Sequence, residues 1–205
     1  MLKKYSILIG IIIGVSLLIV ATFYYPGGTS ENLDSIGYDW ANNYLSNLLS
    51  PLAVNGLYNN SRPFAISGIL FLTASFGFFF VRFSRRIKIK SAAFVIKYFG
   101  ILATVFGFLT VAPSLHDIMV TLSSILTLLI FFYITFLVIK TNLTVLKIVS
   151  VIFLLTFYLG AYMYFARAFL DYMPMMQKVI FGIKIVWILW LEYFTNAKDY
   201  QHINK

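Results

Sequence analysis

Six apolar runs set the strongest limit on what this chain can fold into. They cover about residues 6–25, 64–83, 93–112, 118–139, 148–169 and 174–195. Each run is long enough to cross roughly 30 Å of hydrocarbon as a helix that rises about 1.5 Å per residue. Helices satisfy their own backbone hydrogen bonds, which lipid cannot do for them. We therefore expect an all-α, polytopic membrane protein, built as one domain of six transmembrane helices.

The composition agrees with a chain whose main solvent is lipid. Of its 205 residues, 60% are hydrophobic and only 11% are charged, whereas a typical soluble domain has about 25% charged residues. The chain has no cysteine, which excludes disulfides and thiolate chemistry. It also lacks phosphate-binding glycine loops, a nucleophile elbow and a convergent set of zinc ligands. We expect no metal and no cofactor, and the sequence leaves open whether the protein is an enzyme.

The basic residues predict the orientation. If both termini are cytoplasmic, only Arg62, Arg167 and Lys178 lie in outer segments. Twelve of the 16 basic residues then lie on the cytoplasmic side: Lys3, Lys4, Arg82, Arg85, Arg86, Lys88, Lys90, Lys97, Lys140, Lys147, Lys198 and Lys205. This bias predicts a multi-pass protein of the cytoplasmic membrane with both termini inside. Loops that face anionic lipid account for the net charge of +9, so no nucleic-acid partner is expected.

The first run contains Gly10-Ile-Ile-Ile-Gly14, a spacing that favours close packing against another helix. This run follows two lysines, as in a signal peptide, but its apolar part is too long and its end is a poor cleavage site. We therefore expect a retained first helix.

The connection between the first two runs contains a polar segment with helical periodicity. In "DWANNYLSNLLS" the Trp, Tyr and Leu residues fall on one half of a helical wheel, and the Asn and Ser residues on the other. Asp39 is a plausible N-cap, and Pro51 follows the expected end. We predict an amphipathic helix of about three turns over Asp39–Ser50. It either floats on the outer leaflet or covers the bundle, so that Asp39, Asn43 and Ser46 face a cavity.

The third and fourth runs are joined by "PSLHD". Ser114 and Asp117 have the spacing of a capping box, which would start the fourth helix. His116 lies in the same turn, and Ser123 and Thr127 follow on nearly the same side of the helix. These polar groups either form hydrogen bonds between helices or line one wall of an outward-facing pocket. In such a pocket His116 would donate or accept a proton near neutral pH.

Two basic residues have more than one interpretation. Arg167 either pairs with Asp171 at i, i+4 or holds an anionic headgroup. Lys184 lies ten residues into the last run, near the predicted bilayer midplane, with no carboxylate at its depth. A lysine there is costly unless it is paired, neutral or near water. Lys184 is therefore either a substrate or proton site or a side chain that extends outward towards the headgroups.

Short motifs suggest a resemblance to known proteins. "YPGG" after the first run, "NYLSNL", "NNSRP" and "PSLHD" occur in this order. The pattern resembles a group of uncharacterised prokaryotic membrane proteins with about six helices. It is also distantly similar to the Frag/DRAM/Sfk family, whose members are linked to lipid and GPI-anchor handling. The resemblance implies a membrane location and a six-helix architecture, and Ser46 and His116 are the positions that match best.

The function we expect is binding or processing of a lipid-like, anionic molecule from the outer leaflet. The candidate pocket residues are Asp39, Asn43, Ser46, His116, Asp117, Arg167 and, more deeply placed, Lys184. The first alternative is a non-catalytic subunit that packs against a partner protein or another copy of itself. The second is a small proton-coupled transporter centred on Lys184. Membrane lipids are partners in each case.

Overall fold

The computed structural model describes residues 2–203, with side chains from Lys4 onward. Six helical stretches are long and apolar enough to cross a membrane: Lys4–Phe23, Arg62–Ser84, Lys90–Leu109, Pro113–Ile139, Thr144–Phe165 and Leu170–Phe194. The six predicted spans are confirmed, and their ends differ from these by five residues or fewer. The described residues contain no β-strand, only two isolated bridges. The chain therefore has the architecture of a multi-pass membrane protein.

The spans consist of long helices with short irregular turns at their ends. The long helices are α1 (Leu2–Phe23), α2 (Arg62–Ser84), α4 (Gly100–Leu109), α5 (His116–Ile139), α6 (Thr144–Phe165) and α7 (Met173–Phe194). The third span joins α3 (Lys90–Phe94), the π-helical turn η2 (Val95–Phe99) and α4. Four short 3-10 helices are η1 (Leu45–Leu49), η3 (Pro113–Leu115), η4 (Leu170–Tyr172) and η5 (Ala197–Tyr200).

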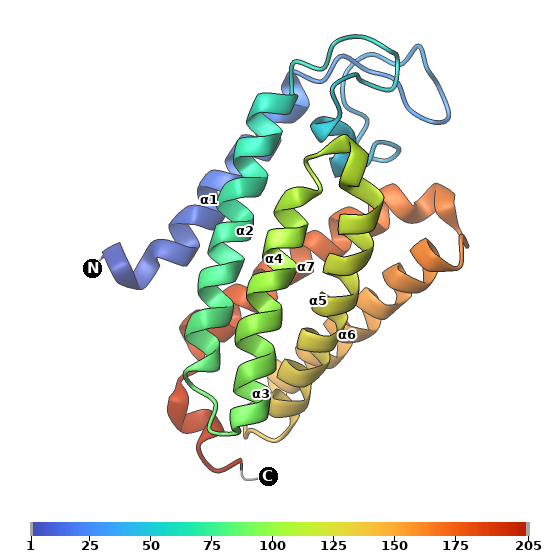
Figure 1. Ribbon diagram of the computed structural model, residues 1–205. Helices are drawn as coiled ribbons and strands as arrows, with labels where there is room; N and C mark the ends of the chain where they lie inside the picture. The colour runs from blue at the N-terminus through green and yellow to red at the C-terminus, as the bar shows by residue number, and fades with distance from the viewer. Residues whose placement is uncertain (1, 204–205) are drawn as a thin grey trace.

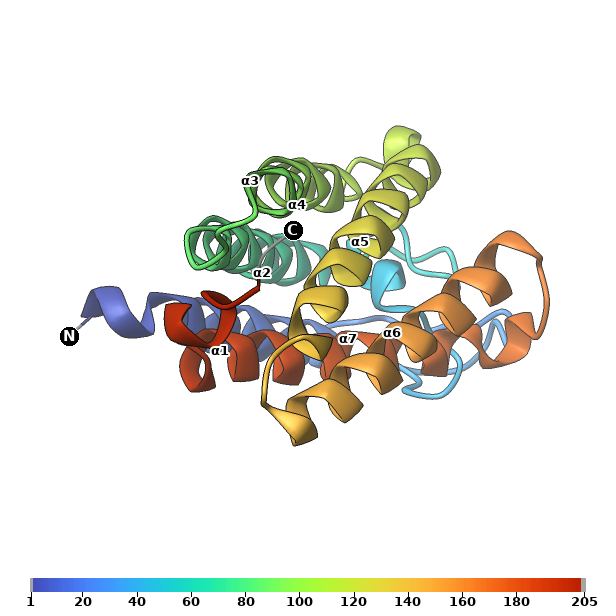
Figure 2. The same ribbon diagram turned by 90° about the horizontal axis from the view of Figure 1, so that it is seen from below.

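Helix α2 lies between α1 and α4, and α5 connects this group to α6 and α7 (Figures 1 and 2). Helices α6 and α7 run obliquely across α2 and α4 (Figure 1). Residues 24–61 form a long connection at one end of the bundle, which we name the loop end. At the other end Arg82 reaches Lys4 O, and His202 Nε2 lies 2.9 Å from Lys140 O. We name this the termini end, since Lys4 and His202, near the two ends of the described chain, lie there.

Small residues bring α1 and α2 into close contact. The predicted packing role of Gly10 and Gly14 is confirmed, and their partner is α2. A Cβ atom on Gly10 would collide with the Ser75 side chain. A Cβ atom on Gly14 would stand 2.9 Å from Gly68 O, and one on Gly68 would stand 2.9 Å from Gly14 O. Because both backbones approach this closely, the glycine face of the first helix is already occupied within the chain.

The predicted amphipathic helix over Asp39–Ser50 is wrong. Asp39 does begin a turn, because its Oδ1 accepts from Ala41 N at 2.8 Å and from Asn42 N at 3.2 Å. The turn stops there, and only the 3-10 helix η1 follows. Asparagine side chains capture the backbone: Asn43 Oδ1 accepts from Asp39 N, and Asn47 Oδ1 accepts from Tyr44 N. Such local bonds compete with a continuous helix.

The loop is fastened to the outer turn of α7. Leu45 N donates to Gln177 Oε1 at 2.7 Å, and Lys178 Nζ donates to Asn43 O at 2.6 Å. Leu48, in η1, is fully buried in the hydrophobic core. The segment therefore covers this end of the bundle, but of the three side chains that the covering placement turned towards a cavity, only Ser46 lines one.

We predict that a methyl group in the glycine seam separates α1 from α2. Gly14→Ala would place Cβ 2.6 Å from Leu72 Cγ as well as near the Gly68 carbonyl. The free energy of unfolding should fall by about 1–3 kcal/mol, the usual cost of overpacking. Denaturant unfolding in detergent measures it. Gly182→Ala is the matched control, because a Cβ there meets nothing within 4 Å. Equal losses in the two variants would contradict the seam.

Candidate functional site

A cavity of about 300 Å³ opens at the loop end between η1 and the α4–α5 turn. We name it the loop-end pocket. It is lined by Ser46, Asn47, Leu49, Ser50, Thr110, Val111, Pro113, His116 and Asp117. Three of the seven predicted site residues, Ser46, His116 and Asp117, therefore line one cavity although the first is distant in sequence from the other two. The lining is mainly hydroxyl, amide, imidazole and carboxylate groups.

His116 and Asp117 are the only titratable residues of this lining. His116 Nδ1 lies 3.0 Å from Asp117 Oδ1, and the Asp117 side chain is 92% exposed. The predicted capping box does not form, because α5 is capped by Leu115 without a side-chain hydrogen bond. Asp117 still lies in the first turn of α5, where a negative charge is favoured by the helix dipole. With Nδ1 beside the carboxylate, the second ring nitrogen of His116 remains available to a ligand.

Asp39 and Asn43, both predicted to face the pocket, hold the loop together instead. The Asn43 side chain is buried, and its Nδ2 donates to Gly28 O at 2.7 Å. Asn42 Nδ2 donates to Asp39 Oδ2 at 2.8 Å, and together with backbone N–H groups it lowers the pKa of the Asp39 carboxyl. Neither residue lines the cavity.

Arg167 does not join the pocket either. It is exposed in the turn between α6 and η4, with a positive φ of 55°. The predicted i, i+4 pair with Asp171 does not form among the described side chains, because the helix ends at Phe165. The i, i+4 geometry needs a continuous helix, and the left-handed residues Arg167 and Phe169 interrupt it.

Lys184 lines a second cavity, of about 150 Å³, between α2, α4, α5 and α7. We name it the Lys184 cavity. Lys184 Nζ lies 4.5 Å from the centroid of the Phe76 ring and 5.7 Å from that of Phe131. The side chain thus points into the bundle and not towards a membrane surface. Each such ring contact contributes about 0.5–2 kcal/mol, and a charged lysine in the middle of a span costs about 3 kcal/mol or more. The rings therefore offset part of this cost, but they accept no conventional hydrogen bond from the ammonium.

The polar stripe predicted along α5 divides between two roles. Ser123 Oγ donates to Ala103 O at 2.9 Å and so joins α5 to α4. Ser123 and Thr127 also line the Lys184 cavity. His116, about two turns before Ser123 and three before Thr127, lines the loop-end pocket. The predicted interhelical hydrogen bond is found at Ser123, whereas the predicted single pocket wall is not, because Ser123 and Thr127 line a different cavity from His116.

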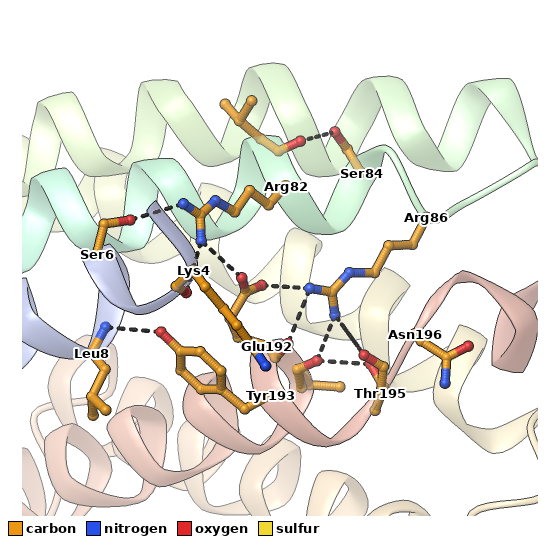
Figure 3. A network of polar contacts seen from close by, with 12 residues as sticks. Lys4, Ser6, Leu8, Arg82, Ser84, Arg86, Glu192, Tyr193, Thr195 and Asn196 are labelled. Carbon is orange, nitrogen blue, oxygen red and sulfur yellow. Dashed lines mark hydrogen bonds and ion pairs between the residues drawn. The ribbon is translucent and has the colours of Figure 1, made fainter. Parts of the chain in front are cut away.

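A charged cluster at the termini end, missed from the sequence, joins three helices (Figure 3). Glu192 on α7 is 8% exposed and accepts from Arg82 at 3.1 Å and from Arg86 at 2.7 Å. Arg82 Nη2 also donates to Ser6 Oγ on α1 at 2.8 Å. Arg82 lies in the last turn of α2 and Arg86 in the turn that follows this helix, and both reach the same acid. One sequence feature could have predicted this cluster: an acid in the last turn of one span at the same membrane depth as two arginines at the end of another.

Arg86 also caps the end of α7 (Figure 3). Its Nη1 donates to Leu191 O at 2.7 Å and to Thr195 O at 3.1 Å. Its Nη2 donates to Glu192 O at 3.1 Å. Carbonyl groups in the last turn of a helix lack intrahelical partners, so the guanidinium satisfies groups that lipid could not. The cluster is structural, because every donor of Arg86 described here is directed at the protein's own backbone or at Glu192 and Thr195.

Removing the Arg86 guanidinium should loosen α7 from α2. We expect Arg86→Met to lower the free energy of unfolding by about 3 kcal/mol, since it leaves the nearly buried Glu192 with one partner fewer. The neighbouring Arg85 is exposed, and no ion pair or hydrogen bond of its side chain is found in the described region. Arg85→Met should therefore change stability little. Thermal unfolding of both variants in the same detergent checks this; comparable losses would show that only net charge matters.

Comparison with known proteins adds no assignment: no family model, no curated protein and no solved structure matches this chain. The resemblance to the Frag/DRAM/Sfk family therefore stays a prediction. The described residues contain no group of three or more His, Asp or Glu side chains placed to hold a metal ion.

Proposed function

We propose that this protein binds the polar headgroup of a lipid-like molecule in the loop-end pocket. One observation carries the proposal: Ser46, from a loop, and His116 and Asp117, from the start of a span, line a single cavity of about 300 Å³. Apolar side chains stand beside it, since Leu115 is 41% exposed and Ile118 is 60% exposed. A polar cavity next to an apolar surface suits an amphiphile whose headgroup and chains need different surroundings.

The charges of the lining favour a headgroup that donates hydrogen bonds. The expectation of an anionic ligand depended on Arg167, which does not line the pocket. No Lys or Arg is found among the lining residues, and Asp117 contributes a carboxylate. Carboxylate, amide and hydroxyl oxygens accept hydrogen bonds from ammonium or hydroxyl groups. An ammonium-bearing or hydroxyl-bearing headgroup is therefore the better match.

Binding is supported more directly than processing. A hydroxyl nucleophile needs a base within hydrogen-bond reach. In the described structure His116 makes its contact with Asp117, and no hydrogen bond joins it to Ser46. The pocket thus offers recognition groups without an assembled nucleophile and base.

We place the loop end on the outer face of a cytoplasmic membrane. The support is the distribution of Lys and Arg: the turn between α2 and α3 contains Arg85, Arg86 and Lys88, and it lies at the termini end. Basic residues of short loops remain on the cytoplasmic side. The pocket would then take lipid from the outer leaflet.

A subunit that only packs against a partner has less support. That alternative used the Gly10 and Gly14 face as its contact surface, and α2 covers this face. A partner or a second copy would need a different surface.

The test compares two lipids that differ in N–H donors. Phosphatidylethanolamine has a primary ammonium, whereas phosphatidylcholine has none. Native mass spectrometry of the purified protein, supplied with equal amounts of each, should show preferential retention of phosphatidylethanolamine. Asp117→Asn should reduce this preference about two- to fivefold, the size of a solvent-exposed ionic contact. Asp171→Asn is the control, because Asp171 is exposed at the same end of the bundle outside the pocket.

The outcomes separate the ligand classes. A second mixture adds an equal amount of phosphatidylglycerol, and preference for this lipid over the other two would return the anionic ligand to first place. Equal retention of all three lipids by the wild type and by Asp117→Asn would overturn a headgroup site here.

A further inference from the structure

The Lys184 cavity is separate from the loop-end pocket and has the opposite chemistry. Its walls come from α2, α4, α5 and α7. Lys184 is the only charged residue in the lining. In the described part of the chain, no carboxylate forms an ion pair with it. A positive charge inside four packed helices is thus not neutralised by any described side chain.

The hydroxyl groups of the cavity fall into two sets. Those of Thr73, Thr104 and Ser123 donate to backbone carbonyls of Ile69, Ile101 and Ala103. Thr127 lines the same cavity, and no hydrogen bond of its hydroxyl is found among the described residues. The same holds for the ammonium of Lys184, whose contacts are the faces of two phenyl rings. Two donor groups, one from α7 and one from α5, therefore face the cavity with their protons uncommitted.

We propose that the Lys184 cavity binds a monocarboxylate, with the carboxylate against Lys184 and Thr127. Lys184 supplies the charge and up to three N–H donors, and Thr127 adds an O–H donor. The remaining lining includes Ile69, Leu72, Phe76, Phe80 and Phe181, which suit the hydrocarbon end of the ligand.

Size limits the occupant. The Lys184 cavity, at about 150 Å³, has half the volume of the loop-end pocket, at about 300 Å³. A carboxylate with a hydrocarbon segment matches its single cation and its apolar walls. The carboxylate belongs either to a free short-chain acid or to the head of a fatty acid whose chain extends beyond the cavity.

This inference does not rest on headgroup binding at the loop-end pocket. The two cavities share no lining residue. Asp117→Asn tests one and Lys184→Met tests the other, so each proposal can fail alone.

The experiment measures stabilisation of the full-length protein by ligand. The protein is placed in phosphatidylcholine nanodiscs at an ionic strength held constant with sodium sulfate. Sodium butyrate or sodium decanoate is then titrated, and thermal unfolding is followed by tryptophan fluorescence. A ligand that binds only the folded state raises the unfolding temperature with concentration. We expect a saturable rise for the wild type, none for Lys184→Met, and an unchanged rise for Lys198→Met, which removes an exposed lysine.

A second pair of variants tests the Thr127 hydroxyl donor and keeps the charge of Lys184. Thr127→Val should raise the half-saturating carboxylate concentration about tenfold, the effect of losing one hydrogen bond to a charged group. Thr135→Val is its control on the same helix, because Thr135 is buried and its hydroxyl has no partner in the described structure. It lies outside the lining and should leave the midpoint unchanged. This pair remains decisive if Lys184→Met does not fold.

The titrations with different salts identify the source of the carboxylate, and the variants can reject the site. Saturation by butyrate assigns a free acid, and saturation by decanoate alone assigns a fatty acid. Equal saturation by sodium chloride would overturn the carboxylate class. Identical titrations of the wild type and Lys184→Met, or of Thr127→Val and Thr135→Val, would overturn the site.

Discussion

Hydrocarbon contains no water, so the polar side chains in the spans, like the backbone, depend on the protein itself for their hydrogen bonds. Six hydroxyl groups within the spans donate to a carbonyl about one turn earlier in their own helix; they belong to Thr22, Thr73, Ser75, Ser84, Thr104 and Thr156. These bonds satisfy both groups at once, so a Ser or Thr in a span does not by itself indicate a site. Two other hydroxyl groups have different surroundings: Ser123 joins two helices, and Thr127 faces a cavity.

Helix α7 shows how the bundle is held once each helix is satisfied. It is the least apolar span, with a mean hydropathy of 1.4, and hydrogen bonds fix it at both ends. Gln177 and Lys178 hold the loop at one end, and Glu192 pairs with Arg82 and Arg86 at the other. Between these ends, Trp187 donates to Ser150 on α6 at 2.8 Å and contacts the rings of Phe131 and Phe153. Lys184 is thus carried on a helix whose position is fixed above and below it.

The sequence predicted the spans and the glycine seam because both depend on local spacing. Hydrophobic length identifies a span without any knowledge of its neighbours, and Gly10 and Gly14 share a face whatever helix they meet. The loop could not be predicted in this way. Its polar periodicity matched a helix, but Asn43 also donates to Gly28, fifteen residues earlier. This contact holds the Asn43 side chain in the loop, and a helical wheel, which shows only local periodicity, cannot predict it.

The candidate sites also differ in whether local spacing or only the fold brings their residues together. His116 and Asp117 are neighbours in sequence, so their pairing was accessible, and only the fold adds Ser46 to them. The predicted pair of Arg167 with Asp171 does not form, because a single turn with positive φ ends the helix that this pair requires. The cluster of Glu192 with Arg82 and Arg86 joins residues more than 100 positions apart. Its components were visible only as an acid at the end of one span and two arginines at the end of another.

The two cavities differ in charge and in hydrogen-bonding groups, and their depth in the bundle explains how strongly each can bind a ligand. At the loop end a carboxylate can remain charged, because the Asp117 side chain is 92% exposed and water solvates it. The interaction it offers a ligand is correspondingly weak, since water competes for both partners. Lys184 is half-buried among the apolar side chains of its cavity, so whatever compensates its charge acts in a medium of lower dielectric, where the attraction is stronger. A shallow site that accepts hydrogen bonds and a deep site that donates them lie along the same pair of helices, α4 and α5, with Thr110 and Gly107 one turn apart on their walls. The chemistry that each can recognise follows from how much water reaches it.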